Sequence, residues 1–516
     1  MRHLALFLTA FLLAAMTAGQ AYSQEADGGG QTLAIVNGLV VDGTGSPPVP
    51  GHVIVRGETI VSVVRGELPG DFQADETIDA EGRVISPGFI DTHAHGSPTS
   101  TPEFENFLAM GVTTIALGQD GGGPRPGTLA ETMQEVDEAE PGPNVMYYIG
   151  HASVRRESGV GHSTDPSEED IAEMVRLVEV GLDAGAWGLT TGLEYYPGYH
   201  AEMEELVAVA RPVAARDGLV LSHMRTEDDD RLEGAIAELA EQGRRSGARV
   251  QVSHMKAVLG EGAERAEEIL DYLNELRADG VEITADVYPY TASFTGIGIL
   301  FPEWAMPPND YAEVREERRD ELAEYLRDIV TLRNGPEAVL FGRNAFVGMT
   351  LAEAAEQEEK PFEEILIELG PRGAGAAYFV MDEELMSRFL LDPHVMVCSD
   401  GSPTMRHPRG YGAFARIINR YVVDRQMMPL EEAVHKMTGL PAETTRLKDH
   451  KRGVLAPGFA ADILVFDPVE VRDTATFEEP HQLAEGFDTV IVNGVIARRG
   501  GEFTGDRGGR VLRMTE

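Results

Sequence analysis

The stretch Ile90-Asp91-Thr92-His93-Ala94-His95 ends the first apolar run after the amino-terminal region of this 516-residue chain, a run that begins at Val84. Because successive side chains of a strand point to opposite faces, His93 and His95 would project from the same face at its end. Two imidazoles at this spacing can bind one metal ion. A lone His-x-His pair is weak evidence for a metal, so its meaning depends on the rest of the chain.

Further apolar runs follow along the chain, and stretches with helical spacing of apolar residues, such as 168–184 and 264–278, separate them. The expected strands are 84–91, 113–117, 145–149, 187–194, 219–223, 250–254, 283–288 and 395–400. This alternation predicts an α/β fold, a TIM-like (β/α)8 barrel. The stretch 301–392 is too long for one crossover, so it predicts an insertion before the last barrel strand.

Short apolar runs separated by glycine turns dominate both ends of the chain. They occupy residues 31–85, after a glycine-rich linker, and residues 456–516. Such runs are typical of β-strands. Neither end is large enough for a core of its own, so the two together predict one small β-sandwich beside a barrel domain at 86–455.

Five metal-ligand side chains fall at the ends of expected barrel strands: His93, His95, His223, His254 and Asp400. The carboxyl ends of barrel strands form one mouth, where active sites lie. Taken singly, each histidine is more often a core or surface residue, but five donors at one mouth predict a metal site. A carboxylate at position 400 would face the ion and accept a proton from water as the catalytic base.

Several longer runs make the sequence resemble a known family. The His-x-His pair, the later strand-end histidines and the last aspartate resemble the amidohydrolase superfamily, and local runs resemble its D-aminoacylase branch, the N-acyl-D-amino-acid deacylases. The similarity extends from about Leu33 to the end of the chain. The runs are Gly192-Leu193-Glu194-Tyr195-Tyr196-Pro197-Gly198, Ser222-His223-Met224-Arg225, Ser253-His254-Met255-Lys256, Ser399-Asp400-Gly401, His407-Pro408-Arg409-Gly410-Tyr411-Gly412, Thr474-Ala475-Thr476-Phe477-Glu478-Glu479-Pro480-His481 and Gly501-Glu502-Phe503-Thr504-Gly505.

This resemblance implies a metal-dependent enzyme that hydrolyses the amide bond of N-acyl-D-amino acids and releases a carboxylate and a free D-amino acid. It also implies one or two Zn²⁺ ions and assigns Asp400 the role of catalytic base. The expected metal ligands are His93, His95, Asp120, His223, His254 and Asp400.

The chain departs from the family at the ligand that joins the metals. Many superfamily members use a carboxylated lysine after strand four, but none of the five lysines here precedes Lys256. The D-aminoacylase branch typically uses a cysteine after strand two, and the corresponding run is Gly118-Gln119-Asp120-Gly121. Asp120 is the candidate for this ligand, with Glu194 as its competitor and a simple turn aspartate as the alternative. A site of nitrogen and oxygen donors would let Mn²⁺ or Co²⁺ compete better with Zn²⁺.

The family's substrates carry a free carboxylate, which needs charged hydrogen-bond donors when it is buried. The predicted substrate-binding residues are Lys256, Tyr288 and Arg409, with Tyr196 as a further pocket residue. The planar guanidinium of Arg409 suits a carboxylate because it offers two parallel donors. Lys256 would lie on the same face as His254 if that strand continues.

Three other interpretations stay open. A cyclic-amide hydrolase of the dihydropyrimidinase type is disfavoured because those relatives ordinarily use the carboxylated lysine. A dipeptidase acting on peptides with a D- or iso-linked residue would share the same hydrolytic core. A non-catalytic exported binding protein on a decayed barrel is disfavoured because all five strand-end donors are present.

The charge of the chain limits its partners. It contains 86 acidic and 43 basic residues, a formal net charge of −43, which repels nucleic acids and anionic membranes. A small molecule with a free carboxylate is the only partner that the sequence indicates, and no pattern indicates an oligomeric state. Residues 1–23 have a basic residue, Arg2, near their start, continue through an apolar stretch and end in small residues, so they predict a secretory signal and export to the periplasm or outside the cell.

Overall fold

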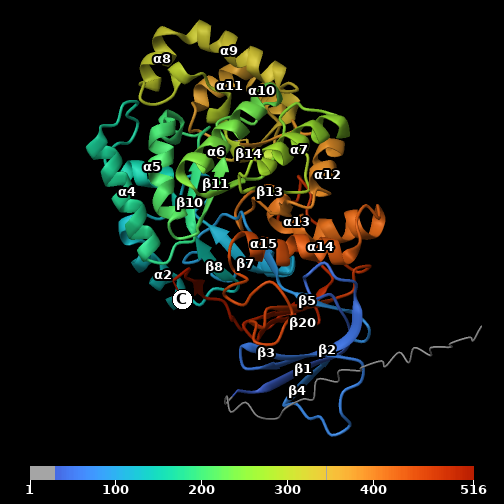
Figure 1. The fold of residues 1–516 in the computed structure, drawn as a ribbon. Coiled ribbons are helices and arrows are strands. Elements are labelled where there is room, and N and C mark those ends of the chain that lie inside the picture. The colour runs from blue at the N-terminus through green and yellow to red at the C-terminus, as the bar shows by residue number, and fades with distance from the viewer. Residues whose placement is uncertain (1–29, 345, 516) are drawn as a thin grey trace, which may run out of the picture.

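A barrel of parallel strands forms the centre of the protein (Figure 1), as shown by a computed structural model that describes residues 30–344 and 346–515. The predicted signal segment, residues 1–23, lies outside the described residues and stays a prediction. The barrel strands are β6 (Phe89–Asp91), β7 (Val112–Leu117), β8 (Asn144–Tyr147) with its continuation β9 (Ile149–Gly150), β10 (Gly188–Gly192), β11 (Leu219–His223), β12 (Arg249–Val252), β13 (Ile283–Val287) and β17 (Val395–Val397). Each lies within an expected strand or within one residue of it.

The barrel is closed between its first and last strands. Parallel pairing runs from β6 through β7 to β8, and from β9 through β10, β11, β12 and β13 to β17. Just beyond β6 and β17, Ala94 and Gly401 form a parallel bridge, and the amide of His95 donates to the carbonyl of Gly401 at 2.8 Å. The predicted (β/α)8 barrel is therefore confirmed.

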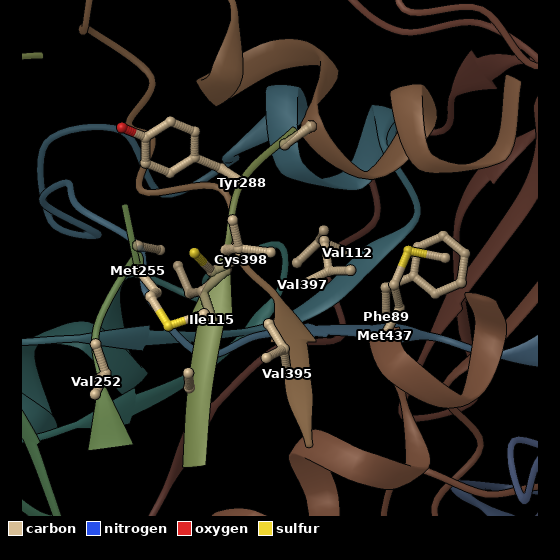
Figure 2. Close-up of a cluster of buried hydrophobic side chains, with 14 of the residues drawn as sticks. Phe89, Val112, Ile115, Val252, Met255, Tyr288, Val395, Val397, Cys398 and Met437 are labelled. Carbon is tan, nitrogen blue, oxygen red and sulfur yellow. The ribbon is translucent and has the colours of Figure 1, made fainter. Parts of the chain in front are cut away.

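Helices surround the barrel and bury their apolar faces against it. Figure 2 shows Val395 and Val397 of β17 in the same buried cluster as Phe89 of β6 and Met437 of α14. These helices are α1 (Glu105–Ala109), α2 (Leu129–Glu138), α3 (His151–Glu157), α4 (Glu168–Asp183), α5 (Met203–Ala214), α6 (Leu232–Ser246), α7 (Gly262–Ala278), α12 (Glu383–Leu390), α13 (Arg409–Arg416), α14 (Leu430–Met437) and α15 (Gly439–Thr444). The dense packing holds the strand ends in fixed positions.

Both ends of the chain join one continuous sheet at one end of the molecule (Figure 1). Its strands are β1 (Thr32–Val40), β2 (Val49–Arg56), β3 (Thr59–Arg65), β4 (Glu76–Asp79), β5 (Val84–Pro87), β18 (Ile463–Phe466), β19 (Phe487–Val492), β20 (Val495–Arg499) and β21 (Glu502–Phe503). Strand β5 pairs with β1 on one side and with β18 on the other, so it connects the two chain ends. The last strand, β22 (Val511–Leu512), does not belong to this sheet and pairs with β8 of the barrel.

The expected strand 84–91 is divided between the two sheets. The division falls at Gly88, whose amide donates to the carbonyl of Asp462 at 2.9 Å. A side chain at this position would lie 2.1 Å from the hydroxyl of Thr113, so only glycine fits. The chain therefore leaves the small sheet and enters the barrel within a single residue.

The insertion carries a sheet and a hydrophobic core of its own, which includes Leu322, Phe341 and Leu366. It contains β14 (Ser293–Gly296), α8 (Tyr311–Glu317), α9 (Arg319–Leu332), β15 (Val339–Arg343), α10 (Leu351–Glu358), α11 (Phe362–Leu369) and β16 (Gly375–Tyr378). The unit thus occupies about 293–380 and not 301–392, because β14 already pairs with β16, and α12 packs on α7 as a barrel helix. In the described part of the chain, no helix is long and apolar enough to span a membrane.

A buried lysine holds the start of the last barrel strand. The ammonium of Lys436, on α14, donates to the carbonyls of Asp392 and Val395, the latter at 2.9 Å. Burial lowers the pKa of Lys436 to about 8. Loss of hydration therefore destabilises the protonated form of Lys436 in the folded protein more than its two hydrogen bonds to carbonyls stabilise it.

Replacing Lys436 with methionine should change how stability depends on pH. Between pH 8 and about 10.5 the unfolded chain holds a proton on Lys436 that the folded protein releases, so wild type gains stability as pH rises. Relative to Lys436→Met, this gain should approach about 3 kcal/mol across the window. Urea unfolding at pH 7.5 and pH 10 measures it, and an equal pH dependence of the two proteins would contradict it.

Candidate metal centre

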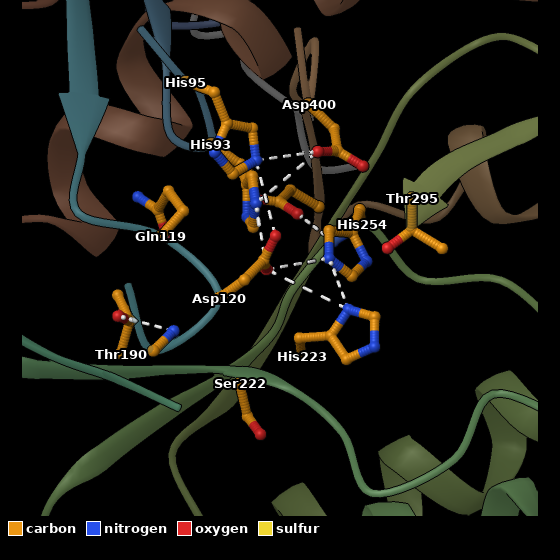
Figure 3. Close-up of polar contacts among 12 residues, drawn as sticks. His93, His95, Gln119, Asp120, Thr190, Ser222, His223, His254, Thr295 and Asp400 are labelled. Carbon is orange, nitrogen blue, oxygen red and sulfur yellow. Dashed lines mark hydrogen bonds and ion pairs between the residues drawn. The ribbon is translucent and has the colours of Figure 1, made fainter. Parts of the chain in front are cut away.

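The six predicted metal ligands meet at the carboxyl ends of the barrel strands (Figure 3). His93 and His95 follow β6, Asp120 follows β7, His223 ends β11, His254 follows β12 and Asp400 follows β17. Together with Glu194, which follows β10, most of them line a cavity of about 240 Å³, called the inner cavity below. Its lining includes His95, Asp120, Glu194, Tyr195, His223, Glu227, His254, Lys256, Thr295, Asp400 and Arg409.

One group of donors lies between the first and last strands. Nε2 of His95 is 3.4 Å from Oδ2 of Asp120 and 3.1 Å from Oδ1 of Asp400. Nε2 of His93 lies 3.3 Å from Asp120 and 3.7 Å from Asp400. The four donor atoms are within 4.8 Å of one another, which is close enough for a single ion to contact them all.

A second group shares Asp120 with the first. Oδ1 of Asp120 lies 3.2 Å from Nε2 of His254 and 3.9 Å from Nδ1 of His223. A side chain at Gly192 would lie 2.2 Å from the carbonyl of Asp120, so this glycine lets the loop after β7 approach β10. Asp120 thus occupies the position between two potential metal sites.

Glu194 and Glu227 lie on the outer sides of the two histidines of this second group. Oε2 of Glu194 is 2.9 Å from Nε2 of His223, the ring nitrogen that faces away from Asp120. Oε1 of Glu227 is 3.1 Å from Nδ1 of His254 and 2.6 Å from the ammonium of Lys256. Metal-binding histidines commonly donate their second ring N–H to a carboxylate, which fixes the ring and its tautomer.

The backbone conformation at three of the donor residues directs their side chains toward the mouth of the barrel. Asp120, His254 and Asp400 adopt positive φ angles of 54°, 35° and 49°. Such angles are uncommon for residues with a side chain and concentrate at functional sites. They explain why His254 and Asp400 lie just beyond β12 and β17 and not within them.

Two buried aspartates beneath the centre hold these turns. Asp91 accepts hydrogen bonds from the amide of His93 at 3.1 Å and from the amide and hydroxyl of Ser399 at 3.0 and 2.5 Å. Asp286 accepts from the amide of His254 at 2.5 Å and from Thr92 at 2.6 Å. Burial raises the pKa of Asp91 to about 7, against the effect of its hydrogen bonds.

The electrostatics of the centre favour a cation. Burial opposes ionisation of both carboxyls, but His93 with the neighbouring histidines lowers the pKa of Asp120 well below its usual range, and Arg409 with these histidines does the same for Asp400. Burial also lowers the pKa of His95, yet hydrogen bonds to both carboxylates raise it to about 9. Ionised carboxylates that draw a proton onto His95 would draw a divalent ion in the same way.

The donor set fits a metal ion. His93 is fully buried, yet neither of its ring nitrogens makes a hydrogen bond, although buried polar atoms are usually satisfied. Imidazole and carboxylate donors suit zinc, manganese and cobalt. His93, His95, Asp120 and Asp400 would hold one ion, and Asp120, His223 and His254 a second.

The predicted substrate-binding residues take different positions. Arg409 and Lys256 line the inner cavity, and Nη1 of Arg409 is 2.8 Å from Oδ2 of Asp400. Tyr288 lies behind them and not in the cavity lining, with its ring centroid 4.7 Å from the Arg409 guanidinium. Tyr196 lines a neighbouring cavity. Strand β12 ends at Val252, so strand alternation does not place Lys256 near His254; a direct contact of 2.8 Å between their nitrogens does.

Sequence reasoning missed Glu227, Asp91 and Asp286 as residues that orient the centre. Glu227 lies four positions after His223, in a loop whose conformation the sequence does not reveal. Asp286 lies within an expected strand at a buried position, where an unpaired carboxylate would be costly. That burial is the signal that could have identified it.

Comparison with known proteins identifies the family. A model described as "Amidohydrolase family" matches residues 76–363 and 391–498. The chain belongs to this family. It is also 34% identical to the N-acyl-D-glutamate deacylase of Alcaligenes xylosoxydans xylosoxydans, over 90% of this chain and 92% of that protein.

Solved structures place the chain in the D-aminoacylase branch, as the sequence predicted. The N-acyl-D-glutamate deacylase of Bordetella bronchiseptica, solved with zinc and a phosphonate inhibitor, has a TM-score of 0.80 and 32% identity, covering 94% of this chain and all of that one. A D-aminoacylase with a binuclear metal centre has a TM-score of 0.79 and 31% identity, covering 93% and 99%. The chain is therefore a metal-dependent amidohydrolase.

Replacing Asp120 with asparagine should lower the metal content of the purified protein. Asparagine keeps the size and one oxygen donor but removes the charge that both donor groups share, so we expect loss of at least one equivalent. The matched control is Glu194→Gln, which should keep its metal because Glu194 contacts the far nitrogen of His223. Metal analysis after dialysis measures both, and the reverse pattern would make Glu194 the ligand.

Proposed function

We propose that this enzyme hydrolyses N-acyl-D-amino acids to a carboxylate and a free D-amino acid. One observation carries the proposal: Asp400 lies between the metal donors and a buried cation, 3.1 Å from His95 on one side and 2.8 Å from Arg409 on the other. A base, a metal site and an anchor for an anion thus occupy one small cavity. The deacylase names of relatives at 30–34% identity support this reaction over cyclic-amide hydrolysis or simple binding.

The cations of the inner cavity would bind the substrate's carboxylate. Arg409 is 1% exposed and Lys256 3%, so a carboxylate there would be largely shielded from water. Hydrogen bonds between charged groups are strongest in such surroundings. Tyr288, whose ring underlies both cations, would hold them in place.

Asp400 would transfer the proton during hydrolysis. Because its pKa is held low, it is ionised at neutral pH and can accept a proton from the water that attacks the amide carbon. As the C–N bond breaks, the same carboxyl would return that proton to the leaving nitrogen. Its bond with Arg409 fixes the orientation of the carboxylate throughout.

We further propose that Zn²⁺ is the resident metal, as one or two ions, with Mn²⁺ or Co²⁺ as substitutes. When bound, the metal supplies a Lewis acid that polarises the amide carbonyl and favours deprotonation of water. His93, His95, Asp120, His223, His254 and Asp400 are the residues that would hold it. The all nitrogen and oxygen donor set supports substitution by the harder ions.

A panel of N-acetyl-D- and N-acetyl-L-amino acids tests the reaction. We expect amine release from the D series, restored by added zinc, manganese or cobalt after stripping with a chelator. Stripping alone should remove nearly all activity, because the donors cannot polarise the carbonyl without an ion. Release from the L series alone, or full activity after removal of the metal, would refute the proposal.

Replacing Lys256 with alanine should raise KM for an N-acyl-D-amino acid by about tenfold or more, the cost of a lost hydrogen bond between charged groups. Metal content should stay near that of wild type. The matched control is Lys448→Ala, which removes an exposed lysine paired with Glu443 and should change neither quantity. A fall in metal content at constant KM would instead show that Lys256 orients Glu227 and His254 and does not bind the substrate.

A further inference from the structure

A second, larger cavity of about 450 Å³ adjoins the inner cavity and has no role in the reaction described above. We call it the outer cavity. It lies between the loop after β10, which carries Tyr196 and Tyr199, and the inserted unit, which contributes Phe301 and Tyr325. The two cavities share wall residues, among them Glu194, Tyr195 and Thr295, so they adjoin.

Tyr195 stands at the passage between the cavities. Its ring centroid is 4.3 Å from that of His223, and its hydroxyl accepts a hydrogen bond from Thr295 at 3.1 Å. The same side chain therefore packs on a metal donor and forms a wall of the outer cavity. A substrate whose amide lies among the donors would extend toward the outer cavity past this ring.

The direction of the substrate follows from the amide bond and rests on the proposed function. In a trans amide, the carbon on the nitrogen side and the carbon on the carbonyl side lie at opposite ends. Arg409 and Lys256 line only the inner cavity, so the amino-acid carboxylate belongs there. The acyl chain then leaves the carbonyl in the other direction, past Tyr195.

The size and the lining of the outer cavity indicate what this acyl chain is. An acetyl group adds a single methyl beyond the carbonyl and would leave the outer cavity to water. The rings of Tyr196 and Tyr199 stack with centroids 4.9 Å apart, Phe301 is buried, and Tyr325 is 39% exposed. Aromatic walls of this kind favour a flat ring, which gains stacking and edge contacts.

Three of the four arginines in the wall of the outer cavity form ion pairs within the protein. Arg231 and Arg333 each lie 2.5 Å from Asp228, and Arg225 lies 2.9 Å from Glu238. Arg372 is the fourth arginine of this wall. In the inner cavity Arg409 and Lys256 are paired as well, with Asp400 and Glu227, so the two cavities differ in their aromatic rings and not in the pairing of their cations.

We infer that the acyl group of the substrate is an arylalkanoyl group, such as phenylacetyl, whose ring lies among the tyrosines of the outer cavity. The enzyme would thus select its substrate at both ends, through the carboxylate in the inner cavity and the aromatic ring in the outer one.

Rates for a series of acyl groups on one D-amino acid test this inference. With the metal-loaded full-length enzyme, kcat/KM should be at least tenfold higher for N-phenylacetyl than for N-acetyl, the scale of one aromatic contact. N-octanoyl serves as the flexible alkyl comparison and should fall below N-phenylacetyl. A preference for acetyl or octanoyl would overturn the inference while leaving deacylation intact, whereas no cleavage of any member would refute the proposed function itself.

Variants of Tyr199 locate the effect in the outer cavity. Tyr199→Ala should reduce the ratio of phenylacetyl to acetyl rates about tenfold, whereas Tyr199→Phe should keep it because the ring is retained. Since the measured quantity is a ratio of two substrates on the same protein, partial misfolding does not imitate the result. Tyr272→Ala, on α7 and outside both cavities, is the matched control and should keep the wild-type ratio. An unchanged ratio in Tyr199→Ala would overturn the assignment.

Discussion

The centre depends on one buried carboxylate that joins the two ends of the barrel. Asp91 ends the first barrel strand and accepts hydrogen bonds from His93 and from Ser399, which lies two residues after the last barrel strand. The first and last strands contribute opposite sides of one donor group, so their separation sets the spacing between the histidine pair and Asp400. Without Asp91, the amides of these two turns would be buried without partners, at a cost in stability. The contact that closes the barrel therefore also sets the geometry of the first donor group.

The sequence predicted much of this arrangement because buried parallel strands are apolar runs and barrel chemistry lies where such runs end. His93, His223 and Asp400 could be found in this way from one chain. The division of residues 84–91 at Gly88 could not, because each half alone is a normal strand and only the partner strands differ. The orientation of Asp120 was equally hidden, since positive φ at a non-glycine residue is a property of the folded loop and not of its composition.

Asp120 can serve as a ligand in both donor groups. A thiolate donates through one atom, whereas a carboxylate has two oxygens, and here Oδ1 faces His254 while Oδ2 faces His95. One side chain therefore faces both donor groups. Glu194 and Glu227 contact the far sides of His223 and His254, so carboxylates orient the ring of each histidine in the second group.

The pairing of β5 with β18 ties the completion of the fold to the order of protein synthesis. Residues 84–87 leave the ribosome hundreds of positions before residues 463–466, so β1 to β5 can pair early but the small sheet is completed only when β18 has been made. Strand β8 likewise lacks one of its partner strands until β22, which includes Leu512, has been made. Contacts so distant in sequence form slowly and leave strand edges exposed in the meantime. A growing chain of this architecture therefore spends most of its synthesis with open edges that a chaperone could recognise.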